Sequence, residues 1–262
     1  MGPPRLLLSA LVLCLATAAR ADDGMSSVGP AVYEPFFPPT PSERAIPVAA
    51  FRIDRTPVTV ALFRDFVRAH PEWRRDRIPR LFADAGYLAR WPSPVDIRPG
   101  DEDRPITEVS WFAAKAYCDA RGARLPTEAE WELVAMASPT QKDGRQDTAW
   151  RARILDWYAR PNPSELPKVG STPANAWGVR DMHGVVWEWV LDFNATMLTT
   201  DPRAAGEKNL LRFCGGGGLT AQDNQDYPTY MRLGFRSSLK ADYTTRNLGF
   251  RCATDVAKEK KP

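Results

Sequence analysis

The stretch Ile106–Ala137, ITEVSWFAAKAYCDARGARLPTEAEWELVAMA, carries the clearest signals of regular structure in the chain. Ser110 is placed to cap a helix, because its hydroxyl can accept a hydrogen bond from a backbone N–H in the first turn. We expect this helix to run to about Arg121. Gly122 then supplies the left-handed residue at which many helices end. The first half of the stretch therefore predicts one well-delimited helix.

The second half of the stretch predicts another helix after the short link ARLP. Thr127 and Glu130 have the spacing of a capping box, in which each side chain hydrogen-bonds the backbone N–H of the other residue. We expect this second helix to run to about Ala137. A further helix is predicted over about residues 60–69, because Thr59 can cap it and its apolar residues fall on one face.

The later part of the chain is rich in Gly, Pro, Asn and aromatic residues. The pieces VVWEWVLDF (185–193), MRLGFRSS (231–238) and NLGFRCATD (247–255) are short and bounded by turn residues, which is typical of strands. No internal repeat indicates a solenoid or a propeller. Capped helices beside an irregular β half predict an α+β fold.

The N-terminal residues 1–21 have the pattern of a secretory signal peptide. Arg5 precedes an apolar run from Leu6 to Ala16, and Ala19 and Ala21 have the spacing of an A-x-A cleavage site. The apolar run is too short to span a bilayer and no second long run follows it, so we expect no stable membrane span. The expected location is periplasmic or secreted.

Three further segments set the expected domain boundaries. Residues 22–46 are rich in Pro, Ser and Gly and are predicted to form an extended N-terminal segment. Residues 71–104 are rich in Arg, Pro and Asp, and no regular element is predicted there. The lysine-rich residues 256–262 are predicted to form a disordered basic tail. A single domain is therefore expected over residues 47–255.

Charge and cysteine content narrow the class of protein. The chain has 35 Lys and Arg against 32 Asp and Glu, and this balance argues against nucleic acid as a partner, because such binding needs clustered positive charge. Beyond the signal peptide the cysteines are Cys118, Cys214 and Cys252. In an oxidising compartment we expect one disulfide and one leftover thiol. Three pairings are possible from composition alone.

Three motifs resemble those of a known family. EVSWFAAKAYCDARGARLPTEAEWE, VGSTPANAWGVRDMHGVVWEW and LGFRCATD have the order and spacing of the core motifs of formylglycine-generating enzymes, also called sulfatase-modifying factors. The resemblance covers roughly residues 47–255. It implies a single domain with the C-type-lectin-like fold of that family and little regular secondary structure. It also implies a disulfide between Cys118 and Cys252, which leaves Cys214 as a free thiol.

The resemblance fails at the family's copper ligands. Enzymes of this family oxidise a substrate cysteine with oxygen, at a copper ion held by two cysteines between a Gly-Gly-Ser strand and the LGFRC motif. The corresponding interval here, residues 219–247, contains no cysteine. Copper held by a cysteine pair is therefore not supported. Cys214, which precedes Gly215–Gly218, is expected to be a buried inert thiol, with a functional thiol and intermolecular pairing as the alternatives.

The resemblance also suggests which residues line a substrate groove. Trp189 matches the tryptophan that borders the groove in the family, although core packing is the ordinary role of a tryptophan. Gly217 or Gly218 stands in place of the serine that faces the substrate site in the family. Arg236 is expected to line the groove or to be a buried hydrogen-bond donor.

Candidate metal ligands and acid/base residues come from the same region. The resemblance implies a structural calcium ion, because in the family an asparagine and a glutamate of a GNVWEW motif help to hold one. Here Val185 occupies the asparagine position, which leaves Glu188 and the carbonyl of Val186 as candidate ligands for calcium, the candidate cofactor. The alternative for Glu188 is a buried structural carboxylate. Glu188, Asp192 and Asp223 are the candidate catalytic acids or bases.

Two functions remain open from the sequence. The first is an exported accessory or maturation factor, an oxidoreductase if it is an enzyme, that acts on another exported protein or peptide without the two-cysteine copper chemistry. The second is a non-catalytic binding protein, such as an immunity or partner-binding protein, that uses the lectin-like scaffold. True formylglycine generation is disfavoured because the copper ligands are missing.

Overall fold

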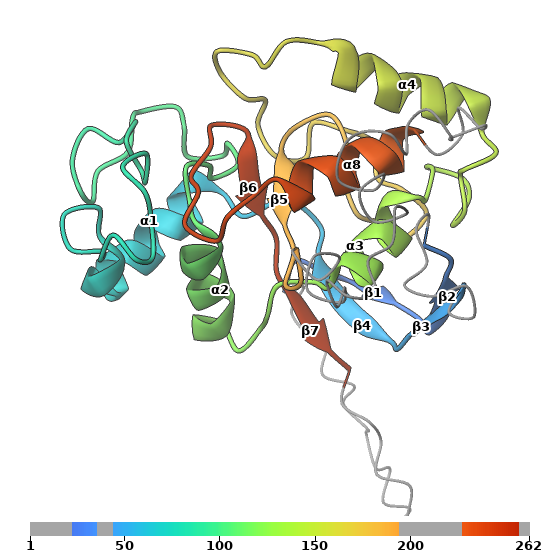
Figure 1. Ribbon diagram of the computed structural model, residues 1–262, viewed down its shortest axis with the longest axis horizontal. Coiled ribbons are helices and arrows are strands. Elements are labelled where there is room, and N and C mark those ends of the chain that lie inside the picture. The colour runs from blue at the N-terminus through green and yellow to red at the C-terminus, as the bar shows by residue number, and fades with distance from the viewer. Residues whose placement is uncertain (1–22, 36–43, 194–226, 257–262) are drawn as a thin grey trace, which may run out of the picture.

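A computed structural model describes residues 23–35, 44–193 and 227–256 of the chain (Figure 1). In chain order the elements are β1 (Met25–Val28), β2 (Ala31–Tyr33), β3 (Ile46–Val48), β4 (Phe51–Asp54), α1 (Val60–Ala69), the short 3-10 helix η1 (Pro71–Trp73), α2 (Trp111–Ala120), α3 (Glu128–Ala135), α4 (Thr148–Ala159), β5 (Trp187–Trp189), α8 (Tyr227–Ser237), β6 (Leu248–Phe250) and β7 (Ala253–Asp255). The strands are three or four residues long. The predicted α+β fold with little regular secondary structure is confirmed.

The described strands form three small sheets. The largest has the order β1-β4-β7 and is antiparallel throughout, with Met25 opposite Asp54 and Ile53 opposite Ala253. β2 pairs with β3, and β5 pairs with β6 in parallel. β5 and β6 come from two of the sequence motifs, so their pairing brings the WEW and LGF segments side by side in the middle of Figure 1.

The sheet corrects the expected domain boundary at residue 47. β1 lies in the segment predicted to be an extended N-terminal segment, but all four of its residues pair with β4. β2, in the same segment, pairs with β3. A four-residue strand such as MSSV is too short to show the alternation by which strands are recognised in a sequence. The folded domain therefore includes residues upstream of 47.

The three helices predicted from capping signals are confirmed. Thr59 caps α1 by accepting from the N–H of Leu62, and Ser110 caps α2 by accepting from the N–H of Ala113. At α3 both halves of the capping box form between Thr127 and Glu130. These caps satisfy backbone groups that a buried helix end would otherwise leave unpaired.

Two helices differ from the sequence predictions. Residues 231–238 are predicted to be a strand, but residues 227–237 form α8. Arg232 and Arg236 lie four residues apart and therefore share one helix face, and both donate hydrogen bonds to Glu132 of α3. α4, which begins at the cap Asp147, was not predicted. Contacts with residues distant in the sequence hold α8 in place, so the residues of α8 alone do not predict a helix.

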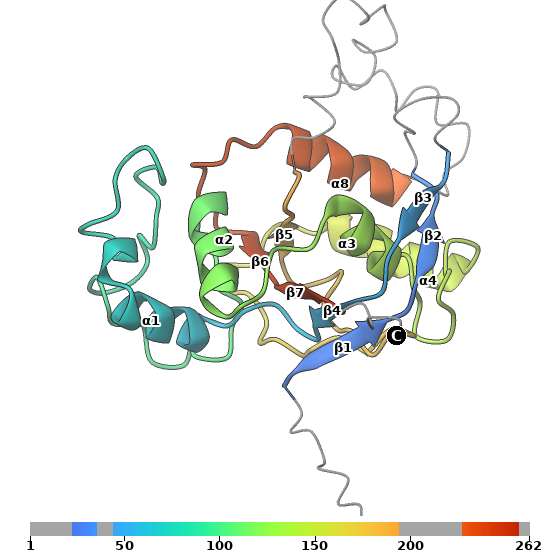
Figure 2. The ribbon, with the colours of Figure 1, turned by 90° about the horizontal axis from the view of Figure 1, so that it is seen from below.

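The hydrophobic core lies between the sheets and the helices α1 and α2 (Figure 2). Phe63 of α1, Tyr117 of α2 and Phe250 of β6 form a cluster whose ring centroids lie 5.4 to 6.1 Å apart. Gly249 is required at the middle of β6, because a Cβ atom there would overlap the carbonyl oxygen of Ile106. The close approach lets the segment before α2 pack directly on the parallel strand pair.

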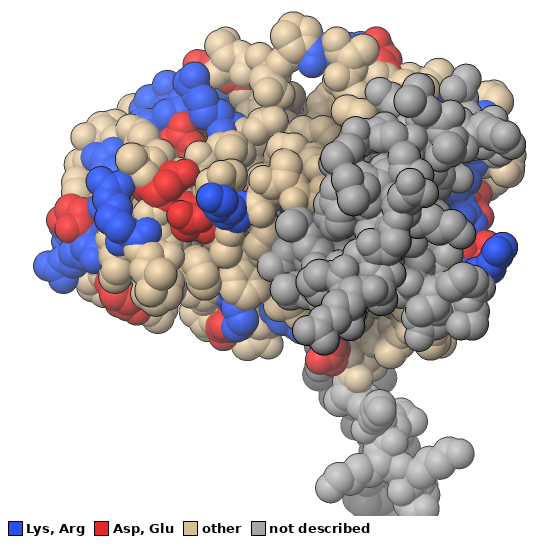
Figure 3. All heavy atoms as spheres, in the orientation of Figure 1, with Lys and Arg blue, Asp and Glu red and all other residues tan. Residues whose placement is uncertain are grey.

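The long segment 71–104 is held by hydrogen bonds rather than by regular structure. The Arg75 guanidinium donates to the carbonyl oxygens of Leu88 and Trp91, both at 2.9 Å. The hydroxyl of the buried Tyr87 donates to the carbonyl of Trp73 at 2.9 Å. In Figure 3 the basic and acidic side chains over this part of the molecule are interspersed, which matches its local ion pairs, such as Arg74 with Asp76.

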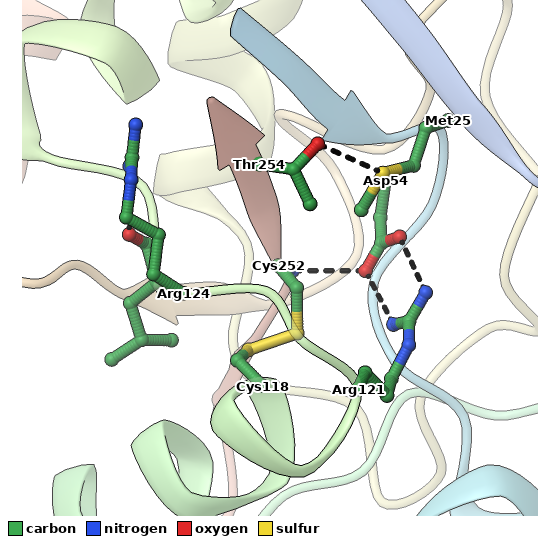
Figure 4. Close-up of a disulfide and its surroundings, with 8 residues drawn as sticks. Met25, Asp54, Cys118, Arg121, Arg124, Cys252 and Thr254 are labelled. Carbon is green, nitrogen blue, oxygen red and sulfur yellow. Dashed lines mark hydrogen bonds and ion pairs between the residues drawn. A yellow bond between two sulfur atoms is a disulfide. The ribbon is translucent and has the colours of Figure 1, made fainter. Parts of the chain in front are cut away.

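A disulfide joins Cys118 of α2 to Cys252, which precedes β7, as the family resemblance implies (Figure 4). Its two Cα atoms are 5.6 Å apart and the cysteines are 134 residues apart in the chain. Beside it, Asp54 accepts hydrogen bonds from the backbone N–H of Cys252 and from both terminal nitrogens of Arg121. Within the described ranges, no helix has the length and apolar character that a membrane crossing requires.

Candidate functional site

The buried carboxylate of Glu188 in β5 accepts three hydrogen bonds. Arg251 donates to its two oxygens through Nε and Nη2, both at 2.7 Å, and Trp131 donates through Nε1 at 2.7 Å. The side chains of Glu188 and Arg251 are both 0% exposed. Arg251 also donates to the carbonyl oxygens of Asp54 and Arg180. The geometry is that of the structural carboxylate considered as the alternative, because the carboxylate is buried and both of its oxygens already accept hydrogen bonds.

The same arrangement does not fit a calcium site at Glu188. Calcium requires six to eight oxygen ligands, but both oxygens of Glu188 already accept hydrogen bonds and the neighbouring charge is the cation Arg251. Val186, the other candidate ligand, is buried next to Leu166 and Val185 in an apolar cluster. In the parts of the chain that the structure describes, no three His, Cys, Asp or Glu residues lie together as a metal site would require.

Trp189 lies in the core. Its side chain is 0% exposed, its indole N–H donates to the carbonyl of Val109 at 3.0 Å, and its ring packs on Phe193. This placement matches the packing role weighed against a groove role. Trp187, two residues earlier in the strand, is half-buried and stacks on Tyr158 with ring centroids 5.2 Å apart.

Arg236 belongs to a buried cluster that we call the acid-arginine triad: Glu132 of α3 with Arg232 and Arg236 of α8. Glu132 is 2% exposed, and the two arginines are 4% exposed. Arg232 donates to both oxygens of Glu132, at 2.9 and 2.6 Å, and Arg236 donates to one oxygen at 2.7 Å. Two cations therefore share one carboxylate, which leaves a surplus positive charge inside the protein.

Neighbouring groups complete the surroundings of the triad. The Arg236 guanidinium lies 4.5 Å from the ring centre of Trp131, a distance at which the ring attracts the cation. Arg232 also donates to the hydroxyl oxygens of Tyr158, at 3.0 Å, and Thr229, at 2.9 Å. Burial by itself would raise the pKa of Glu132, but the two arginines outweigh it and lower the pKa to about 2. Glu132 is therefore ionised at every ordinary pH.

Glu128, one turn before Glu132 on α3, is a candidate that the sequence analysis missed. Burial raises the pKa of its carboxyl to about 7, although Arg236 opposes the shift. Its backbone N–H donates to Oδ1 of Asp192 at 2.7 Å, so Asp192, a predicted acid/base candidate, lies beside it. The first turn of a helix is an ordinary place for an acidic residue, which is why the sequence does not single Glu128 out.

A cavity opens beside the triad, where β2, α3 and α8 meet at the right of Figure 2. Its volume is about 290 Å³. Among the described residues, its lining includes Tyr33, Glu34, Glu132, Met136, Arg145 and Thr229. Hydroxyl and charged groups therefore dominate its wall. The cavity therefore lies between Glu132, Thr229 and the strand β2. β2 belongs to the segment that was predicted to lie outside the domain.

His183 has a structural environment. Its Nε2 lies 2.8 Å from the carbonyl oxygen of Ala135, and its ring packs edge-on against Trp131 and Trp150. Burial lowers the pKa of His183 to about 3, so the ring is neutral at physiological pH. The remaining predicted site residues, Cys214, Gly218 and Asp223, lie outside the described residues.

The chain belongs to the family described as "Sulfatase-modifying factor enzyme 1-like domain", whose pattern matches residues 20–256. It is 32% identical over 251 residues to a formylglycine-generating enzyme of Streptomyces coelicolor, covering 79% of this chain and 78% of that protein. It is 28% identical over 297 residues to "Inactive C-alpha-formylglycine-generating enzyme 2" of Mus musculus, covering 92% and 83%. The family named from the sequence motifs is thereby confirmed.

Other relatives carry other names. The chain is 33% identical over 163 residues to a hercynine oxygenase of Mycobacterium tuberculosis, a match that covers 55% of this chain and 38% of that protein. Among solved structures, PvdO from Pseudomonas aeruginosa aligns with a TM-score of 0.49 at 19% identity, covering 88% of this chain and 94% of that chain. The family thus includes enzymes named for formylglycine generation and for oxygenation, and a protein named as inactive.

Proposed function

We propose that this chain is an exported accessory or maturation factor that acts on another exported protein or peptide, without the two-cysteine copper chemistry of formylglycine-generating enzymes. One observation carries the proposal. The family domain is matched over residues 20–256, yet no cysteine occurs between residues 219 and 247. The chain therefore keeps the scaffold and lacks the soft ligands on which copper chemistry depends.

Export rests on two further features. Residues 1–21 have the pattern of a signal peptide, and the disulfide between Cys118 and Cys252 suits an oxidising compartment. The proposed location is periplasmic or secreted. A fusion of residues 1–30 to a reporter that folds only after export tests this point. Failure of the fusion to be exported and cleaved would contradict the location.

A second candidate, a non-catalytic binding protein, is favoured by the state of two buried carboxylates. Glu188 is fully buried and accepts three hydrogen bonds, and Glu132 is neutralised by two arginines. Such groups hold a scaffold together and do not exchange protons with a ligand. In this reading the chain recognises its partner and leaves it chemically unchanged.

A gene deletion separates the two candidates. Intact masses of exported proteins and peptides are compared between the parent strain, the deletion strain and the complemented strain. A maturation factor predicts one exported species whose mass changes on deletion and is restored by complementation. Unchanged masses, together with a stable complex between the purified chain and an exported partner, would establish the binding protein instead.

Metal analysis of the purified protein tests whether the copper chemistry of the family is absent. Stoichiometric copper would contradict the proposed loss of the cysteine-pair chemistry. Conversion of a cysteine-containing peptide to its aldehyde by the purified chain would contradict it equally. We expect neither result, and we expect a Cys214→Ser variant to behave as the unaltered chain does.

A further inference from the structure

The cavity between β2, α3 and α8 has a wall that is built from hydrogen-bond donors. Tyr33 lines it and is only 6% exposed, yet its hydroxyl forms no hydrogen bond within the described part of the chain. Tyr33 and Glu132 line the same cavity. Burial, and after it the charge of Glu132, raises the pKa of Tyr33, so its hydroxyl remains a neutral donor. The hydroxyl is available to donate a hydrogen bond to a ligand or to water in the cavity.

Thr229 supplies a second donor. It lines the cavity, and its oxygen already accepts a hydrogen bond from Nη2 of Arg232 at 2.9 Å. The hydroxyl proton must then point away from Arg232. A donor whose oxygen accepts from a cation is strengthened, because successive hydrogen bonds polarise one another. The Arg145 guanidinium also lines the cavity and pairs with Asp143 at 2.9 Å.

The acid-arginine triad, which lies beside the cavity, carries a net positive charge. In the acid-arginine triad two arginines share the single carboxylate of Glu132, so one positive charge is surplus. Glu132 itself has little acceptor capacity left, because Arg232 and Arg236 together make four hydrogen bonds to its oxygens. Glu34, the one other carboxylate among the described lining residues, is exposed. The interior of the cavity is therefore donor-rich and positive.

We propose that this cavity binds a carboxylate of a peptide ligand, through the hydroxyls of Tyr33 and Thr229 and the surplus charge of Arg232 and Arg236. A singly charged group matches the single surplus charge. A doubly charged anion would face greater repulsion from Glu34 and Glu132. The cavity of about 290 Å³ has room for an acidic side chain or a chain terminus. The inference rests on the proposed function, because it names the chemistry by which the exported partner is recognised.

The test uses the full chain, labelled with ¹⁵N, and three capped peptide mimics. N-acetyl-glutamate N-methylamide carries a side-chain carboxylate, N-acetyl-alanine carries a terminal carboxylate, and N-acetyl-glutamine N-methylamide carries none. We expect saturable shifts at the amides of Glu34 and Thr229 with at least one acid, and binding of the glutamine mimic at least about tenfold weaker. The preferred acid identifies the source of the carboxylate.

Substitutions that remove a single hydroxyl and keep the fold test the role of each donor in binding. Tyr33→Phe and Thr229→Val remove one hydroxyl each with little change of shape, and each should weaken binding of the preferred acid about tenfold. Tyr117→Phe is the matched control, because Tyr117 is also buried but lines a separate cavity beside α1. It should leave binding unchanged. Glu34→Gln should strengthen binding about twofold, since it removes an exposed negative charge.

Several outcomes would overturn the inference. These are equal binding of the acids and the glutamine mimic, tighter binding of inorganic sulfate than of the acids, or no saturable shift with either acid up to the high millimolar range. Unchanged affinity in folded Tyr33→Phe and Thr229→Val would do the same. If the chain still acts on its exported partner in that case, the proposed function stands and the carboxylate pocket alone is wrong.

Discussion

Two carboxylates in the interior, Glu132 and Glu188, are each held by arginine and have different surroundings. Glu188 has one arginine and one tryptophan, so its charge is balanced. Glu132 has two arginines, so its cluster carries a surplus positive charge. A balanced buried pair holds strands together, whereas a surplus charge beside a cavity attracts an anion. The first is a structural device and the second is a candidate binding site.

Breaking the balanced pair should destabilise the protein strongly. Glu188→Gln leaves the charge of Arg251 buried without a partner, which costs about 3–5 kcal/mol in such pairs. Chemical denaturation at neutral pH measures the loss. Asp156→Asn, which removes an exposed partner of Arg160, should change the free energy of unfolding by less than about 0.5 kcal/mol. Equal effects of the two substitutions would contradict the structural role of Glu188.

Glu128 should make stability depend on pH near neutrality. Its pKa is about 7 in the folded protein against an ordinary value of 4.5, so the folded state holds this proton over a range in which the unfolded state has lost it. Stability from this group is therefore greatest below pH 4.5, falls as pH rises to about 7, and is constant above that. Because the side chain is partly exposed, we expect a loss of about 1–2 kcal/mol.

The variant Glu128→Gln isolates that contribution. Its free energy of unfolding should lack the decline between pH 4.5 and about 7, while other groups still titrate in both proteins. Denaturation midpoints of the two proteins across this range provide the comparison. A difference between the two proteins that stays constant with pH would show that Glu128 titrates normally.

The sequence alone identified Glu188 and Arg236 as residues of interest but did not identify their partners. Arg232 and Glu132 are 100 residues apart in the chain, and their contact exists only after α8 packs on α3. Burial by these packed elements also perturbs the pKa of Glu128. Local sequence shows the residue types, whereas the charge balance and the raised pKa arise from tertiary packing.

At the scale of elements, the helix caps were predictable from the sequence, and the elements that depend on tertiary packing were not. The caps Thr59, Ser110 and Thr127 satisfy helix ends through residues at most three positions away, so the sequence contains the whole interaction. The strand β1 and the helix α8 depend on partners far along the chain. That dependence explains why β1 was placed outside the domain and α8 was predicted to be a strand.

The capping box of α3 offers a test at this scale. Thr127→Ala removes the side-chain acceptor for the N–H of Glu130 and should destabilise the protein by about 1 kcal/mol. Thr127→Ser keeps that acceptor and should recover most of the loss. Thermal unfolding of the three proteins measures both effects. Equal stability of the alanine and serine variants would show that the cap contributes little.

Across the whole molecule, the disulfide connects α2 to the strand β7 of the main sheet. Cys118 and Cys252 close a loop of 134 residues, and a loop of this length corresponds to about 4–5 kcal/mol in the chain-entropy account. The double variant Cys118→Ala and Cys252→Ala should lose about that much in chemical denaturation. Reduction of the unaltered protein should lower stability similarly, and Cys214→Ser should not. A double variant as stable as the parent would contradict this role.

The central claim is that a formylglycine-generating-enzyme scaffold here serves another exported molecule without a cysteine-pair copper site. The most direct measurement incubates the purified chain, and separately its Cys214→Ser variant, with the exported fraction of the deletion strain, and follows intact masses. The account predicts that one exported species changes mass equally with both proteins. Conversion of a cysteine to its aldehyde, or a mass change that is lost in Cys214→Ser, would contradict it.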